Sequence, residues 1–167
     1  MRSIAVPQRL ALPLYVQNLV FVGPALHPDQ MALAARHGVA DRIATFQKVP
    51  HRELRVLYAR ATALLFPSLQ EGFGWPLIEA QACGCPVITS DLAPMNEIGG
   101  PGACYVDPHD PEGIARAIEQ AAARFEQMRA LGLDNVRHYS TARMTSSYVA
   151  AYRGVLMSRR PVGEGQN

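Results

Sequence analysis

Two glutamates, Glu71 and Glu79, flank a glycine-rich segment that can bind a phosphate group. The segment reads Glu-Gly-Phe-Gly-Trp-Pro-Leu-Ile-Glu and runs directly into an apolar helical pattern. A helix that begins near Pro76 turns unpaired backbone N–H groups and the positive end of its dipole toward Gly74 and Trp75. Helix starts of this kind bind anions well. We therefore expect a phosphate site at residues 74 and 75.

The two glycines of this segment allow a ligand to approach the backbone closely. Gly72 and Gly74 can adopt positive φ values that other residues avoid, and Pro76 suits the first turn of a helix. Glu71 then precedes the phosphate site, and Glu79 follows about one turn inside the helix. Two acceptors on either side of a diphosphate could hold hydroxyl-rich groups, which fits a nucleotide-sugar. An ordinary helix start with a solvated Glu79 is the alternative that this segment alone leaves open.

The composition of the chain indicates a soluble globular domain. Its 167 residues suffice for one domain with a real core, and 49% of them are hydrophobic against 18% charged. A net charge of +2 gives no basis for a nucleic-acid partner. The three cysteines lack a metal-binding spacing and a histidine cluster, so we expect reduced thiols, no metal and a cytoplasmic location.

Short apolar runs alternate with helical patterns along most of the chain. The runs are bounded by turn residues, as buried strands usually are, and one helix begins at an Asp-Pro pair, Asp110 and Pro111, which suits an N-cap. We expect strands at residues 19–22, 43–47, 63–66, 86–90 and 103–106. We expect helices at residues 28–37, 53–61, 77–82, 95–98, 111–125, 124–137 and 141–157.

This alternation predicts an α/β fold: a Rossmann-like, doubly wound parallel sheet with helices on both faces. Ligands of such sheets bind where loops leave the carboxyl ends of the strands. Segments at Gly23, at residues 49–50, at residues 68–75 and at residues 90–95 occupy such positions. We expect them to converge on one rim, with the phosphate site in the middle.

Residues 19–154 resemble the C-terminal, donor-binding domain of the family-four retaining glycosyltransferases, which have the GT-B fold. The resemblance rests on an ordered set of motifs, of which the Glu-x7-Glu element is the centre. A Pro-Ser pair at residues 67–68 precedes it, and Ala-Cys-Gly-Cys-Pro-Val-Ile at residues 82–88 follows it. Asn-Glu-Ile at residues 96–98 and Val-Asp-Pro at residues 106–108 complete the set.

The resemblance implies a role for each residue of the segment. Glu71 matches the catalytic-site glutamate that holds donor-sugar hydroxyls near the reacting carbon, and Glu79 matches the glutamate that binds the ribose hydroxyls. The backbone of Phe73, Gly74 and Trp75 matches the loop whose amides meet the sugar and the phosphates. Residues around Val49 match the loop that borders the base.

The family implied by this resemblance transfers a sugar with retention of configuration and needs neither a metal nor a further cofactor. Amide dipoles at a helix start can stabilise a departing diphosphate, so the residues agree with metal-free chemistry. The expected partners are a nucleotide-sugar donor and a glycan, lipid or small-molecule acceptor. The resemblance also leaves open a peripheral membrane association of the full enzyme.

The chain also departs from the family pattern. A first strand and loop that carry an Arg and a Lys for the diphosphate have no counterpart before residue 19, and no acceptor domain is present. We therefore expect residues 1–18 to be a partial N-terminal segment, residues 19–157 to be the donor-binding domain and residues 158–167 to be a disordered tail. The first βα unit of the sheet is then lacking, and residues 4–6 or 12–16 are the candidates to fill its central gap.

Two readings of function follow from these observations. The first is a glycosyltransferase of which this chain is the donor-binding half, with acceptors bound by a missing N-terminal domain. The alternative is a truncated, non-catalytic module that binds a nucleotide or a partner subunit without turnover. An ordinary dinucleotide-binding dehydrogenase is disfavoured because no Gly-x-Gly-x-x-Gly follows the first strand. Ser68 is expected to stabilise a turn rather than bind phosphate, and Trp75 stands where the family more usually has a smaller aliphatic residue.

Overall fold

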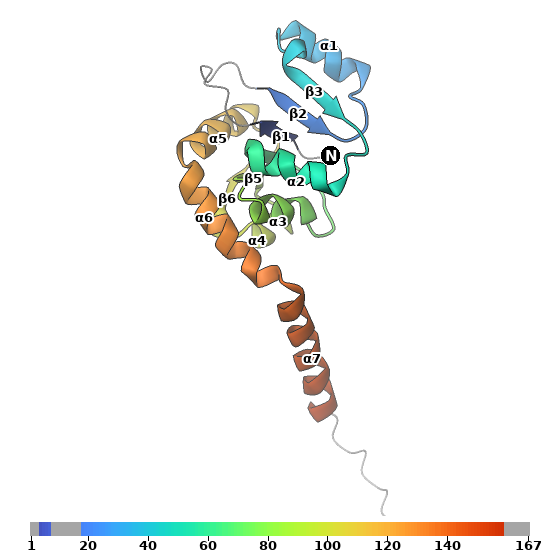
Figure 1. Ribbon diagram of the computed structural model, residues 1–167, viewed down its shortest axis with the longest axis vertical. Helices are drawn as coiled ribbons and strands as arrows, with labels where there is room; N and C mark the ends of the chain where they lie inside the picture. The colour runs from blue at the N-terminus through green and yellow to red at the C-terminus, as the bar shows by residue number, and fades with distance from the viewer. Residues whose placement is uncertain (1–3, 8–17, 159–167) are drawn as a thin grey trace, which may run out of the picture. The chain divides into compact units, whose positions relative to one another are not determined.

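A computed structural model describes residues 4–7 and 18–158 of the chain. The chain divides into two compact units, residues 1–136 and residues 137–167. The first unit holds the sheet and the helices that cover it (Figure 1). The second unit contains α7 (Thr141–Ser158). The tail predicted at residues 158–167 lies outside the described residues apart from Ser158, which ends α7.

A six-stranded sheet in the order β3-β2-β1-β4-β5-β6 forms the centre of the first unit. The parallel pairs are β2 with β3, β4 with β5, and β5 with β6. β1 pairs antiparallel with both β2 and β4, so β2 and β4 run in the same direction. The strands are β1 (Ile4–Pro7), β2 (Leu19–Val22), β3 (Ile43–Phe46), β4 (Ala61–Phe66), β5 (Val87–Ser90) and β6 (Ala103–Val106).

The central position of the sheet is occupied by β1, one of the two segments proposed to fill it. The backbone of Ile4 lies opposite Phe21 on one side and Leu65 on the other. The sheet is therefore parallel except for this strand, whereas the sequence pattern predicted parallel strands throughout. Residues 8–18 are fewer than the dozen or more that a parallel crossover needs, but they suffice for an antiparallel connection. The other proposed segment, residues 12–16, lies outside the described residues.

The helices begin and end close to the predicted positions. α2 starts two residues earlier than expected because Pro50 serves as its N-cap, and the amide of Glu53 donates to the Pro50 carbonyl at 2.9 Å. Asp110 is the N-cap of α5, although its side chain makes no capping bond and pairs with Arg116 at 3.3 Å instead. The helices are α1 (Pro28–Arg36), α2 (His51–Arg60), α3 (Trp75–Ala82), α4 (Met95–Ile98), α5 (Pro111–Ala123) and α6 (Phe125–Asn135).

The core has two layers, one on each face of the sheet. Leu64 and Phe66 of β4 pack with Tyr58 of α2 and Leu77 of α3. The alternate residues of the same strand pack with α5 and α6 on the opposite face. Figure 1 shows α2 and α3 in front of the sheet. This two-faced burial explains why β4 reads as a continuous apolar run in the sequence.

A buried polar network anchors the far part of α3. The amide nitrogen of Gln81, whose residue is 1% exposed, donates to the Gly99 carbonyl at 2.7 Å. Asn135 of α6 in turn donates to the Gln81 side-chain oxygen at 2.8 Å and to the Ile98 carbonyl at 2.9 Å. A satisfied buried network of this kind fixes the position of a helix. The start of α3 is thereby held in place from its other end.

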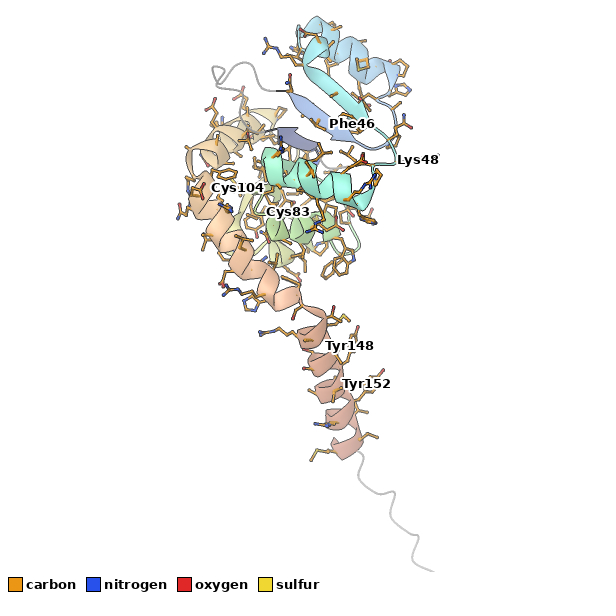
Figure 2. The ribbon with its side chains drawn as sticks, in the orientation of Figure 1. Phe46, Lys48, Cys83, Cys104, Tyr148 and Tyr152 are labelled. Carbon is orange, nitrogen blue, oxygen red and sulfur yellow. The ribbon has the colours of Figure 1, made fainter. Side chains whose placement is uncertain are left out.

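Helix α7 of the second unit carries two exposed tyrosines. Tyr148 and Tyr152, which are 60% and 69% exposed, project from α7 one turn apart (Figure 2).

Within residues 4–7 and 18–158, no helix has the length and apolar character that crossing a membrane requires.

Candidate functional site

The loops that carry the predicted site leave the same edge of the sheet. Strands β2 to β6 all run in one direction, as their pairings require. The turns after β2, β3, β4 and β5 therefore share the carboxyl edge, where ligands of such sheets bind. The segment between β4 and α3, residues 67–74, lies centrally in this row.

Helix α3 begins with a backbone geometry that only glycine adopts easily. Its N-cap is Gly74, with φ 93° and ψ 35°, and the Leu77 amide donates to the Gly74 carbonyl at 3.0 Å. In the described part of the chain, no side chain caps this start. The prediction of a positive φ is thus confirmed at Gly74. It is wrong at Gly72, where the loop also bends but Gly72 is not among the positive-φ glycines.

Glu71 is held by a serine at the end of β4. The Ser68 hydroxyl lies 3.1 Å from a carboxylate oxygen of Glu71 and 3.1 Å from the Gln70 carbonyl. The Glu71 side chain is half-buried, so one oxygen is fixed while the carboxylate keeps acceptor capacity for a ligand.

Ser68 is in turn fixed to the neighbouring strand. It is 2% exposed, and its carbonyl accepts a hydrogen bond of 2.6 Å from the hydroxyl of Ser90 at the end of β5. The predicted turn role of Ser68 agrees with this geometry. The loop that carries Glu71 is consequently tied to two adjacent strand ends.

Two aromatic rings sit at the start of α3. The rings of Phe73 and Trp75 have centroids 4.7 Å apart and are tilted by 42°, within the range of favourable aromatic pairs. Phe73 is half-buried, whereas Trp75 is 59% exposed.

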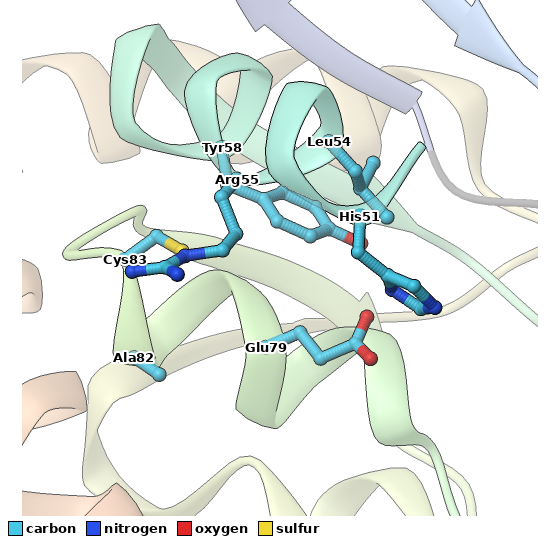
Figure 3. A pocket seen from close by; sticks show the side chains of 7 residues that line it. All are labelled: His51, Leu54, Arg55, Tyr58, Glu79, Ala82 and Cys83. Atoms are coloured by element: carbon cyan, nitrogen blue, oxygen red, sulfur yellow. The ribbon is translucent and has the colours of Figure 1, made fainter. Parts of the chain in front are cut away.

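Glu79 lines a partly open pocket between α2 and α3. The pocket has a volume of about 210 Å³. Figure 3 shows the Glu79 carboxylate directed toward the His51 ring, while the Arg55 guanidinium lies near Cys83. Its lining residues are His51, Leu54, Arg55, Tyr58, Glu79, Ala82 and Cys83.

Of the six predicted site residues, Glu79 is the one that lines this pocket. Glu71, Phe73 and Gly74 belong to the loop before α3, and Trp75 opens the helix. Val49 is half-buried and follows Lys48, which has a φ of 52° in the turn after β3 (Figure 2). That turn leads directly into α2, so Val49 precedes the pocket residue His51 by two positions.

Sequence reasoning missed the contribution of α2 to the pocket. The residues concerned are His51, Leu54, Arg55 and Tyr58, and their spacing of three, four and seven places them on one helical face. That spacing is the sequence feature from which a shared helical face could have been predicted. Leu54 and Tyr58 also pack in the core, so their apolar spacing predicted burial rather than a pocket.

The thiols near the pocket are held in their neutral form. Burial raises the pKa of the Cys83 thiol, although the neighbouring Arg55 guanidinium opposes the shift. Burial raises the pKa of Cys85 to about 12. Within the described residues, no three His, Cys, Asp or Glu side chains gather in a way that could hold a metal ion.

Comparison with known proteins places this chain in a family. Residues 5–124 match the family model described as glycosyl transferases group 1. The O-antigen chain mannosyltransferase RfbU of Salmonella typhimurium is 43% identical over 79 residues, which cover 47% of this chain and 22% of that protein. The D-inositol 3-phosphate glycosyltransferase of Segniliparus rotundus is 34% identical over 140 residues, which cover 80% of this chain and 31% of that protein. The chain thus spans a fifth to a third of these relatives' length.

Solved structures agree on the fold. WaaG, a glycosyltransferase involved in lipopolysaccharide biosynthesis, matches 72% of this chain with 27% identity and a TM-score of 0.57, over 32% of its own length. Sucrose-phosphate synthase from Thermosynechococcus elongatus matches 84% of this chain with a TM-score of 0.70 over 39% of its length, and its 24% identity speaks for the fold alone. The fold is the Rossmann-like half of a GT-B glycosyltransferase.

Proposed function

This chain belongs to the group 1 glycosyltransferases, and from that membership we propose that it is the donor-binding half of an enzyme that uses a nucleotide-diphosphate sugar. The observation that carries the proposal is the start of α3. There Gly74, a buried residue, opens the helix without a side-chain cap, between a glutamate that precedes it and one that follows it in the sequence. The sugar goes to a glycan, lipid or small-molecule acceptor with retention of configuration.

The diphosphate binds at the amides of Gly74 and Trp75. The positive end of the α3 dipole and the lack of a capping side chain at this helix start favour an anion. Gly74 permits the left-handed turn from which the helix, and with it the row of free amides, begins. The same amides stabilise the charge that develops on the departing diphosphate, so the residues can act without a metal or other cofactor.

Glu71 holds the hydroxyls of the donor sugar near the reacting carbon. Its hydrogen bond from Ser68 fixes the carboxylate before the sugar arrives, and preorganised acceptors lose little entropy on binding. Two carboxylates at one sugar carbon would be needed for a double displacement. Glu79 is assigned to the ribose and not to the sugar carbon. The proposal that the sugar keeps its anomeric configuration therefore rests on the family to which the chain belongs.

Glu79 accepts hydrogen bonds from the ribose hydroxyls. It faces the pocket between α2 and α3, whose volume of about 210 Å³ gives room for part of a nucleoside. His51 lines this pocket, and the turn at Val49 leads into helix α2, which forms one wall of it. This arrangement supports a nucleotide base that lies near the start of α2. The nucleoside and the sugar then extend from opposite ends of the diphosphate.

The acceptor, the cellular location and a membrane association are proposed for the whole enzyme. The relatives are about three to five times as long as the matched part, so we assign the acceptor to a part of the whole enzyme outside the matched residues. The three free cysteines are consistent with a reducing, cytoplasmic location. A peripheral association of the whole enzyme with a membrane belongs to the same proposal.

Calorimetric titration with UDP, GDP and ADP tests the donor site. We expect one nucleotide to bind selectively, and Glu79→Gln to weaken it by about tenfold or more, because hydrogen bonds to charged groups contribute about 1.5–3 kcal/mol. Glu119→Gln, an exposed change on α5, is the matched control and should leave affinity unchanged. If none of the three nucleotides binds, the non-catalytic partner-binding module becomes the better description.

A further inference from the structure

We propose that the indole of Trp75 is a platform on which a pyranose ring stacks. This inference rests on the proposed function and names the group that the helix start receives beside the diphosphate. Trp75 is 59% exposed, whereas Leu77 and Ile78 of the same helix are 0% and 8% exposed. A large aromatic surface left open to water gains free energy when a ligand covers it.

The indole is held in a defined position before any ligand binds. The ring of Phe73 packs against it at 4.7 Å, and Phe73 is itself half-buried in the loop. Gly74 between them has a left-handed backbone, which brings the two side chains to the same side of the turn. A rigid aromatic surface binds with a small loss of conformational entropy.

The neighbourhood of the indole suits a ring with one apolar face and a hydroxylated edge. Glu71 lies in the loop before α3, four residues ahead of Trp75, and Ser68 fixes its carboxylate. A pyranose offers C–H groups to an aromatic face while its hydroxyls donate to an acceptor at the edge. In this proposal the indole of Trp75 supplies the apolar contact and the carboxylate of Glu71 the polar one.

The nucleoside has its own place, which argues against a base on Trp75. The pocket between α2 and α3 is lined by Glu79, His51 and Tyr58, and Trp75 is not part of its lining. With the nucleoside on that side of the diphosphate, the group near the Phe73–Trp75 pair is a sugar. The pyranose can come from the donor or from an acceptor glycan, and the test below separates these sources.

Trp75 is the single tryptophan of the chain, so its fluorescence reports on this position alone. We would titrate the chain with GDP, UDP, GDP-mannose, UDP-glucose and free α-mannotriose. A donor sugar predicts a blue-shifted emission with one nucleotide-sugar that its nucleoside diphosphate does not produce. An acceptor sugar predicts the shift with the free trisaccharide.

Variants make the test quantitative. Trp75→Leu should lose at least fivefold of the affinity for the responding sugar ligand while the affinity for the nucleoside diphosphate stays unchanged. Trp75→Phe should recover part of that loss. Circular dichroism should show unchanged folding for both variants, because the replaced side chain is mostly exposed.

Three results would overturn the inference. A full emission shift with a nucleoside diphosphate alone would assign the indole to the nucleoside. Nucleotide-sugar binding in calorimetry, with no change in emission for any nucleotide-sugar or for the free trisaccharide, would remove the platform and leave the donor site standing. Failure of every nucleotide and sugar to bind would overturn the platform and the proposed function together.

Discussion

The hydroxyl of Ser68 lies 3.1 Å from the carboxylate of Glu71, and this hydrogen bond sets where the carboxylate stands. Ser68 is buried at the end of β4, and the Ser90 hydroxyl of β5 donates to its carbonyl at 2.6 Å. The position of Glu71 is therefore inherited from the sheet rather than from the loop alone. The Ser68 hydroxyl positions the Glu71 carboxylate, and the Ser90 hydroxyl stabilises the buried Ser68 carbonyl. Substituting each serine tests the two effects separately.

Ser68→Ala should weaken the binding of the nucleotide-sugar more than that of the nucleoside diphosphate. The change removes the bond to Glu71, and a hydrogen bond to a charged group contributes about 1.5–3 kcal/mol, so a loss of about tenfold is expected. Calorimetry with both ligands measures the difference.

Ser90→Ala is the matched control for this prediction. It leaves the buried Ser68 carbonyl without that donor, which should lower the free energy of unfolding by about 1–3 kcal/mol. The opposite pattern, with Ser68→Ala affecting only stability and not sugar binding, would separate Ser68 from the donor site.

Gly74→Ala should lower the stability of the chain, whereas Gly72→Ala should not. Gly74 has a φ of 93°, and a left-handed backbone costs a residue with a Cβ about 1–2 kcal/mol. A Cβ at Gly72 meets nothing within 4 Å, and Gly72 is not among the positive-φ glycines. Urea unfolding of both variants measures the contrast. Equal midpoints would show that the loop does not require this conformation.

Cys85 should make the stability of the chain depend on alkaline pH. Burial raises its pKa from 9.0 to about 12 in the folded state, so its contribution is complete below about pH 9 and is lost as the pH rises toward 12. Between pH 8 and pH 10 the loss should be about 1.4 kcal/mol.

Comparison with Cys85→Ala isolates this effect from other groups that titrate in the same range. The difference in unfolding free energy between the two proteins should shrink between pH 8 and pH 10. A constant difference would mean that the thiol is no harder to ionise in the folded chain.

A bound nucleotide should protect Cys83 from alkylation. Cys83 lines the pocket that contains Glu79, whereas Cys104 lies on β6 and packs with the α5 side of the core (Figure 2). Both thiols are half-buried and both have raised pKa values, so Cys104 serves as an internal control. Iodoacetamide labelling with mass spectrometry should show slower modification of Cys83 alone. Equal labelling with and without saturating nucleotide would place the nucleotide outside this pocket.

Much of the fold follows from local patterns in the sequence. β4 and β5 are short apolar runs that end before Pro67 and Asp91, and helix α5 starts at an Asp-Pro pair. Turn residues therefore mark where these elements begin or end. The direction of β1 does not follow from such patterns, because its four residues carry no information on which neighbours they pair with. Long-range pairing and the short connection to β2 decide it.

The sequence predicted the segment from Glu71 to Glu79 as a candidate site but not the pocket face of α2, because only the segment is local in the sequence. The Glu-x7-Glu spacing at a helix start predicts roles for Glu71, Gly74 and Glu79 because the proposed chemistry is local to one segment. The pocket face of α2 depends on how α2 and α3 pack, and a helix pattern alone does not reveal that. The roles given to Glu71, Glu79 and Val49 stay predictions.

An NMR titration of the ¹⁵N-labelled chain with the nucleoside diphosphate selected by calorimetry shows whether the diphosphate binds at the start of α3. We expect the backbone amide signals of Gly74 and Trp75 to shift most and to saturate together, and Glu79→Gln to raise the nucleotide concentration needed for saturation. Saturable binding that leaves these two amides unmoved while shifting signals elsewhere would contradict this expectation.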